Sequence, residues 1–199
     1  ASDVYKRQGN IVYNPIKDLT LSAVFSYIRD NMNRGYGETL SHISALRDGL
    51  AGWSSVGAYT KMEKLMELTA QYNKEIGAHK FSVLGGYSYN ETDFEELWID
   101  NYGFQDDYFG GWHNIGIGSA LKDGKANIGS KKTPTNLIGF FGRATYSFKN
   151  RYLLMGALRY EGASQLWGTD NAWGLFPSVS VGWRITEEAF IKNQKIFDD

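Results

Sequence analysis

Aromatic side chains gathered between residues 91 and 135, with carboxylates among them, are the groups in this chain best suited to recognition chemistry. A flat ring can cover the C–H face of a sugar, while neighbouring carboxylates and amides bind its hydroxyl groups. The pattern therefore indicates contact with a sugar or a peptide, although the same rings could instead pack against a partner protein or against one another. With one aromatic residue of a later loop, the candidate ligand or partner contacts are Trp98, Tyr102, Tyr108, Trp112 and Trp167.

Motifs for catalysis or cofactor binding are absent from the sequence. His42, His79 and His113 lie far apart and lack the H-E-x-x-H spacing of a zinc site. Neither the G-x-S-x-G elbow of a serine hydrolase nor the glycine-rich loop of a nucleotide-binding protein occurs. We therefore expect no catalytic residue, no metal site and no cofactor, and we expect that the protein is not an enzyme.

Composition excludes several further classes of protein. The 199 residues carry 21 Lys and Arg against 22 Asp and Glu, a balance that gives no electrostatic footprint for nucleic acid. The chain contains no cysteine, which excludes disulfide scaffolds and thiol catalysis. No apolar run approaches the ~20 residues of a membrane-spanning helix. A membrane β-barrel stays possible, because its strands are half polar in sequence.

The elements that would position these residues are strands, because apolar and polar residues alternate along much of the chain. Between Leu19 and Tyr27, for example, every odd position is apolar and most even positions are small and polar. Residues 59–72 also fit a helix, but they lead directly into the next alternating segment, so a hairpin and hence a strand is preferred. The expected strands are residues 10–13, 19–27, 59–72, 81–90, 138–148, 152–162 and 175–185.

Connections between these strands alternate in length. Those at 14–18, 73–79 and 149–150 are short, whereas 29–57 and 91–135 are long and 163–171 is of middling length. Short turns at one rim and long loops at the other are typical of a transmembrane barrel, as are strands of ~9–11 residues with aromatic ends. The sequence thus predicts an all-β, antiparallel up-and-down transmembrane β-barrel segment of about seven strands, with short periplasmic turns and long extracellular loops. A soluble carbohydrate-binding β-sandwich is the alternative, and an outer-membrane enzyme barrel is a third, weaker one.

From Ile138 onward the sequence resembles the SusC/RagA family, TonB-linked outer-membrane transporters of Bacteroidetes-type bacteria. The hairpin at 72–89 is also similar to that family. Glu161-Gly162-Ala163-Ser164 departs from it, because the family usually has Asp-Gly-Ser-Ser there. The elements that carry the resemblance are Gly142-Arg143 with Tyr146, Arg151-Tyr152-Leu153-Leu154, Arg159 with Gly162, Phe176-Pro177-Ser178 with Gly182-Trp183, and Glu187-Glu188 with Phe190.

This resemblance implies a transport function rather than a reaction. It implies import of oligosaccharides, or of peptides, across the cell outer membrane, with outer-membrane lipid around the barrel. Expected partners are the TonB complex, through an N-terminal plug region that this chain lacks, and a SusD-like lipoprotein. No nucleic acid is expected as a partner. Residues 1–8 are expected to be a non-native or junction segment, and residues 9–199 to be a partial TonB-dependent receptor β-barrel.

Arg143, Arg159 and Glu161 lie on the polar sides of two neighbouring expected strands. An arginine facing lipid near the middle of a bilayer would cost ~2–4 kcal/mol, so both arginines are expected to face the lumen. There the three residues are predicted to form an ion network, or alternatively to contact the plug or the solute.

Overall fold

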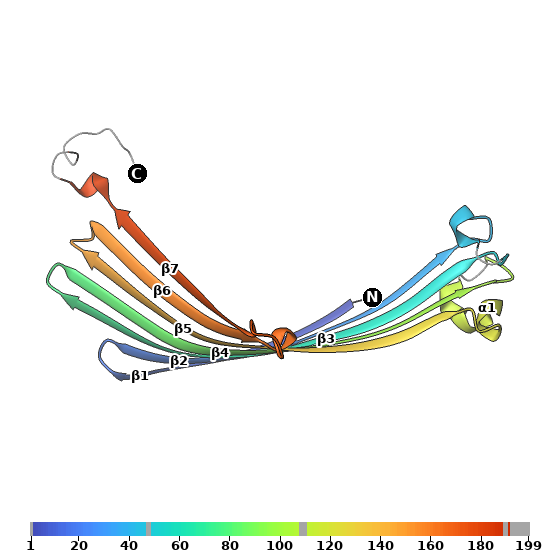
Figure 1. Ribbon diagram of the computed structural model, residues 1–199, viewed down its shortest axis with the longest axis horizontal. Coiled ribbons are helices and arrows are strands. Elements are labelled where there is room, and N and C mark those ends of the chain that lie inside the picture. The colour runs from blue at the N-terminus through green and yellow to red at the C-terminus, as the bar shows by residue number, and fades with distance from the viewer. Residues whose placement is uncertain (1, 47–48, 108–110, 189–190, 192–199) are drawn as a thin grey trace. The chain divides into compact units, whose positions relative to one another are not determined.

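Seven strands dominate the computed structural model, which describes residues 2–46, 49–107, 111–188 and 191. They pair in chain order within one antiparallel sheet (Figure 1). This confirms the all-β, up-and-down arrangement, including a strand rather than a helix over residues 59–72. The strands are β1 (Ser2–Ile16), β2 (Leu19–Glu38), β3 (Trp53–Ile76), β4 (His79–Tyr102), β5 (Asn127–Phe148), β6 (Tyr152–Ala163) and β7 (Trp173–Trp183).

Helical elements are few and short in the described part of the chain. None of them has the length and apolar character needed to cross a membrane. Residues 2–8 lie in β1, and their expected origin as a junction stays a prediction. The helices are η1 (Ile43–Ala45), η2 (Gly111–Ile117), α1 (Ser119–Lys122), η3 (Ser164–Leu166) and η4 (Ile185–Glu187).

Tight turns join β1 to β2, β3 to β4 and β5 to β6. In the last of these, Lys149 and Asn150 have φ angles of 53° and 55°, and the Arg151 N–H donates to the Phe148 carbonyl over 2.9 Å. Two successive positive φ angles make a type I′ turn, whose twist matches that of the flanking strands. Asn tolerates such a φ better than most residues, which is why the dipeptide marks this hairpin in the sequence.

Strands β2 to β5 are longer than the sequence predicts, and this corrects the expected loops. Residues 29–38, 53–57, 91–102 and 127–135, expected within long connections, belong to strands. In these stretches the apolar residues share their side of the strand with polar or charged ones, as Met32 and Tyr36 do with Asp30 and Arg34, so no clean period-two signal appears. Backbone pairing and cross-strand polar contacts hold them instead, such as Lys132 with Glu95 at 2.6 Å. The connections that remain, 39–52 and 103–126, are still longer than the tight turns.

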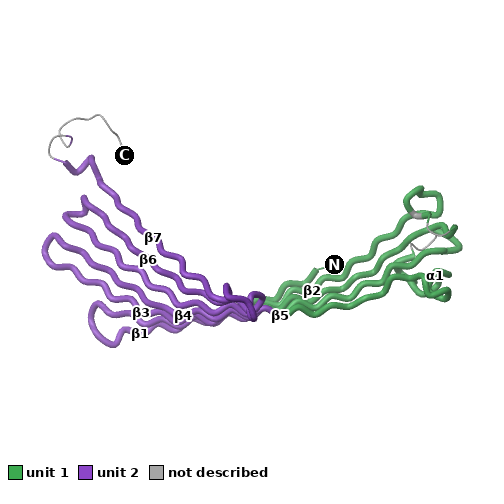
Figure 2. Tube along the Cα trace, viewed as in Figure 1, with its two compact units in different colours: residues 1–7, 27–63, 92–134 green, residues 8–26, 64–91, 135–199 purple. Residues whose placement is uncertain are grey.

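The chain divides into two compact units (Figure 2). Unit 1 comprises residues 1–7, 27–63 and 92–134 and contains the two long connections and α1. Unit 2 comprises residues 8–26, 64–91 and 135–199 and contains the three tight turns, β6 and β7.

Within unit 2, the register of β5, β6 and β7 places their apolar rows on one side, called the apolar face below. Directly paired residues of neighbouring strands point to the same side of a sheet. Arg143, Arg159 and Glu161 alternate with these rows and lie on the opposite side, called the polar face. The pairs that define the apolar face are Phe140 with Tyr160, Tyr146 with Leu154, Leu154 with Val181 and Leu158 with Pro177.

No second layer formed by the described residues covers the apolar face. Phe140, Leu158 and Val181 are 50%, 48% and 77% exposed. Among the large and small hydrophobic residues described, only Phe104 and Ala120 are buried, both in unit 1. A soluble β-sandwich would seal these rows between two sheets. That alternative therefore finds no support, and the exposed apolar face needs an apolar environment outside the chain.

Candidate functional site

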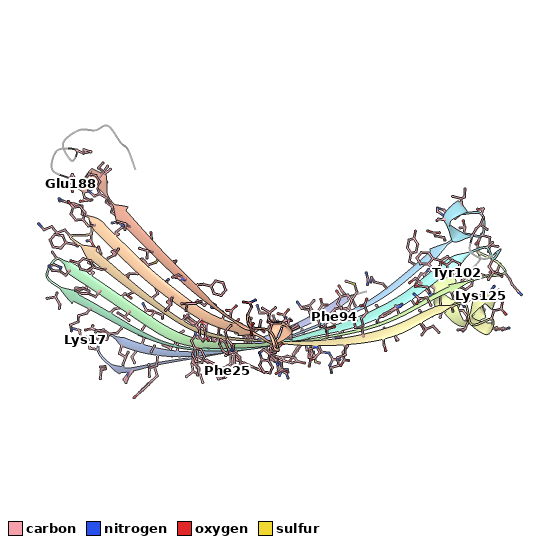
Figure 3. All side chains as sticks on the ribbon, in the orientation of Figure 1. Lys17, Phe25, Phe94, Tyr102, Lys125 and Glu188 are labelled. Atoms are coloured by element: carbon pink, nitrogen blue, oxygen red, sulfur yellow. The ribbon has the colours of Figure 1, made fainter. Side chains whose placement is uncertain are left out.

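Trp98 and Tyr102 lie on strand β4 and not in a loop as expected; Figure 3 labels Tyr102 at the end of that strand. Trp112 lies in η2, and Trp167, which follows η3, is 65% exposed. Tyr108 lies outside the described residues. Of the four described candidates, two share a strand, and the other two lie on separate connections.

A row of three rings crosses the strands of unit 1 beside these candidates. The Trp53 ring on β3 lies 6.4 Å from that of Tyr102 and 5.3 Å from that of Tyr36 on β2, measured between ring centroids. Such cross-strand ring pairs stabilise a sheet by ~0.5–1.5 kcal/mol each beyond their buried area. Tyr36 and Trp53 were missed because the sequence placed them in a long loop. The signal that could have found them is aromatic residues near strand ends.

A hollow of about 240 Å³, called the ring hollow below, opens beside this row. Trp98 packs its indole over Gly129 of β5, a position where any Cβ would collide with the ring. Glycine thus lets the indole lie flat against the neighbouring strand. The ring hollow is lined by Arg34, Tyr36, Trp53, Ser55, Gly57, Ala58, Glu96, Leu97 and Trp98.

Trp112 packs on the other side of β2. Its ring contacts the positions where Cβ atoms of Gly35 and Gly37 would stand. Since successive strand residues point to opposite sides, these contacts place Trp112 on the side of β2 away from Tyr36. The structure therefore separates Trp112 from the ring hollow and from Trp98.

Asn101 organises the connection on which Trp112 lies. Its side chain is fully buried, and its amide donates to the carbonyls of Ile115 at 2.7 Å and Gly118 at 3.0 Å. Its amide oxygen accepts the N–H of Tyr102 over 2.9 Å. Because a buried amide needs such partners, Asn101 ties η2 and the start of α1 to the end of β4.

Of the three ion-network candidates, the structure brings two together. Arg159 bonds to Glu161 on its own strand, lies 5.7 Å from the centre of the Phe141 ring, and reaches the Ser88 hydroxyl at 3.5 Å. Arg143 stands opposite Ala157 in the register, and the part of the chain that is described gives it no ion pair. Both arginines lie on the polar face, where water or protein can solvate them.

A second hollow lies on unit 2, near the tight turns. It measures about 440 Å³, and its lining includes the hydroxyl side chains of Ser82, Thr145, Ser147 and Ser180. The Ser147 hydroxyl is buried without a hydrogen-bond partner among the described residues. Hydroxyl groups at these positions alternate with the apolar rows, so this hollow belongs to the polar face.

Glu188 fastens the segment after β7 to the β5–β6 hairpin (Figure 3). Its carboxylate accepts the Tyr152 hydroxyl at 2.7 Å, the Trp183 indole N–H at 3.1 Å and an Arg151 N–H at 2.8 Å. The hydrogen bonds from Tyr152 and Trp183, together with the charge of Arg151, hold the pKa of Glu188 below its usual value of 4.5. The contact is therefore strongest with Glu188 ionised.

Metal-ligand geometry is not found in the described ranges: no three His, Asp or Glu side chains there are grouped so as to hold an ion. The arrangement offers ring surfaces, hydroxyls and isolated charges instead.

Residues 3–192 match the family described as TonB dependent receptor-like, beta-barrel. The chain is 30% identical, over 95% of its length, to TonB-dependent receptor P26 of Formosa agariphila, covering 19% of that protein. It is 32% identical, over 74% of its length, to TonB-dependent receptor SusC of Bacteroides thetaiotaomicron, covering 14% of that protein. The chain thus spans a fifth or less of these relatives.

Among solved structures, the chain is similar to one titled as the RagAB peptide transporter, with a TM-score of 0.73 and 22% identity. The likeness covers 95% of this chain and 20% of that one. A structure of the RagAB peptide importer in its 'open-open' state gives a TM-score of 0.68 over 96% of this chain and 21% of that one, at 22% identity. At this identity the likeness shows the fold.

Proposed function

The chain belongs to the TonB-dependent receptor β-barrel family, and from this we propose that it forms part of the wall of an outer-membrane transporter that imports oligosaccharides. Transport needs no bond to be made or broken, so the protein is not an enzyme. Its location is the outer membrane.

The observation that carries the proposal is the exposed apolar face of β5 to β7. Val179 and Val181 are each 77% exposed and Leu175 is 58% exposed. Burying one such side chain away from water is worth ~1.5–3 kcal/mol. Since no layer of the described part of the chain covers it, the face gains this stabilisation from lipid tails.

The length of β7 fits the thickness of a membrane. Its 11 residues begin at Trp173 and end at Trp183, both on the apolar face. At ~3.3 Å per residue the two rings are ~33 Å apart along the strand, and a tilt of ~40° reduces this to ~25 Å. That is the height of the apolar band of an outer-membrane barrel, with a ring at each interface.

The polar face suits the lumen. It carries Arg159 paired with Glu161, as well as Arg143 and the hydroxyl-lined hollow. Either arginine facing lipid near the midplane would cost ~2–4 kcal/mol. The lumen, filled by water or by a plug domain of the whole protein, removes that cost.

The family resemblance implies two partners. A TonB complex, acting through a plug region, supplies the energy for import, and a SusD-like lipoprotein, acting as a lid, captures the solute. An oligosaccharide is preferred as the solute because ring surfaces beside polar groups suit sugars. A peptide is the second candidate.

Uptake by cells that express the full-length protein tests the proposal. A fluorescently labelled neutral oligosaccharide should enter only while the proton gradient is intact, and the protein should fractionate with the outer membrane. Uptake that is unchanged after a protonophore is added would contradict the proposal, as would recovery of the protein in a detergent-free soluble fraction.

A further inference from the structure

The ring hollow of unit 1 combines ring surface with one charge of each sign. The Tyr36 ring is 55% exposed, so packing within the sheet does not use all of its surface. Arg34 and Glu96 supply a guanidinium and a carboxylate at the wall, and Ser55 supplies a hydroxyl. Gly57, also in the wall, leaves open the space that a larger side chain would fill.

Positions along the strands indicate that the hollow faces the lumen. On β4, Glu96 and Trp98 are even-numbered, like Ser82 and Ser88, and the odd-numbered row of that strand carries the apolar residues Phe81, Val83 and Tyr87. Contacts within unit 1 keep a steady register between β4 and β5, since Glu95 pairs with Lys132 and Asp100 with Asn127. Ser88 lies against Gly139 and Trp98 lies against Gly129, so both strands advance by ten residues between these contacts, and no bulge in one strand alone reverses the sides there.

We propose that the ring hollow is a subsite for one neutral pyranose ring of the transported oligosaccharide. This inference rests on the proposed function and adds the class and position of the bound sugar. The rings of Tyr36, Trp53 and Trp98 cover the C–H face of the sugar. Arg34 donates to its hydroxyl oxygens, and Glu96 accepts from its hydroxyl groups.

Size and charge select the occupant. At about 240 Å³, the hollow is smaller than the ~300–1,000 Å³ of sites for drug-sized ligands, so it takes one sugar unit and not the whole oligomer. The guanidinium and the carboxylate balance each other. A uronic acid or a sulfated sugar would need an excess of cations, because burying an unpaired charge is costly.

Substitution of Gly57 tests the subsite with little disturbance of the sheet. A Cβ at Gly57 meets only the Leu97 carbonyl, at 3.6 Å, which is an ordinary contact. Gly57→Leu therefore fills the hollow with the strand intact. The matched control is Gly85→Leu: a Cβ there has no atom within 4 Å, and the position lies in the odd-numbered apolar row of β4.

Binding of maltohexaose, cellohexaose, mannohexaose and oligogalacturonate is measured by calorimetry on the purified full-length protein. We expect at least one neutral hexaose to bind, Gly57→Leu to weaken it at least tenfold, Gly85→Leu to leave it within twofold, and the uronate to bind more weakly. Heat-modified migration on electrophoresis confirms that both variants form the barrel.

Three results would overturn the subsite: equal affinity of Gly57→Leu and wild type, tighter binding of the uronate than of any neutral hexaose, or no binding of any neutral hexaose. Proton-gradient-dependent uptake with an unaffected Gly57→Leu would reject the subsite alone. Uptake that ignores the proton gradient would reject the proposed function.

Discussion

Arginine substitution at adjacent residues of β7 separates a lipid-facing row from a lumen-facing one. Val179 stands near the middle of β7, is 77% exposed and pairs with Gly156 on the apolar face. Ser178, its neighbour, pairs with Ala157 on the polar face. Val179→Arg and Ser178→Arg thus place the same side chain at nearly the same depth on opposite sides.

The expected difference in stability between the two variants follows from the position of Val179 near the middle of the apolar band. At the midplane a lipid-facing arginine costs ~2–4 kcal/mol, which is ~30- to ~900-fold in the folding equilibrium. Ser178→Arg adds a long polar side chain to an exposed position beside small neighbours, where substitutions usually change stability by no more than ~0.5 kcal/mol.

Heat-modified migration and the amount of assembled protein in purified outer membranes measure this difference in the full-length protein. Val179→Arg should unfold at a lower temperature than wild type and accumulate less, and Ser178→Arg should resemble wild type. Equal behaviour of the two variants, or greater damage by Ser178→Arg, would refute the assignment of the faces.

Three further substitutions test contacts that the structure shows. Asn101→Ala removes the hydrogen bonds of its side chain to the Ile115 and Gly118 carbonyls and from the Tyr102 N–H, at ~0.5–1.5 kcal/mol each; proteolysis within residues 103–126 should speed up at least ~10-fold, and unchanged protection would contradict this. Glu188 has a lowered pKa, so it stabilises the folded protein at neutral pH, and this stabilisation is lost as pH falls below about 4.5. The melting temperature of wild type should therefore drop more between pH 5 and pH 3 than that of Glu188→Gln. Parallel pH profiles would show that the ionised Glu188 does not stabilise the folded protein. Gly86→Ala drives a Cβ into the Phe141 ring; the loss should be smaller in a Phe141→Ala background, and strict additivity of the two changes would argue against the contact.

Sequence reasoning recovers the paired rows of β5, β6 and β7 well, because apolar residues on one side and polar or small residues on the other give a period of two. The rows through Phe140, Leu158 and Val181 are placed correctly for this reason. The tight turn at Lys149 and Asn150 can also be predicted from the sequence, since its positive φ angles restrict which residue types can occupy it. The resemblance to the SusC/RagA family is confirmed by the family match and the curated relatives.

Strand extensions were the part of the fold that sequence could not predict. Residues 91–102 carry charges on both sides, which obscures the period of two that distinguishes a paired strand from a loop. The ring hollow could not be predicted for the same reason. Tyr36 and Trp53 come together with Trp98 only when β2, β3 and β4 run side by side. Side-chain contacts of Arg159 also depend on register, which alternation alone does not supply.

Spin labels along β7 of the full-length protein test most directly whether its two sides meet different solvents. Single cysteines at 178, 179, 180 and 181 carry a nitroxide, with any other cysteine replaced, in outer-membrane lipid vesicles. Positions 179 and 181 should collide with dissolved oxygen from the lipid, whereas 178 and 180 should be shielded from it. A uniform profile, or one with the two pairs exchanged, would contradict a wall with lipid on one side and lumen on the other.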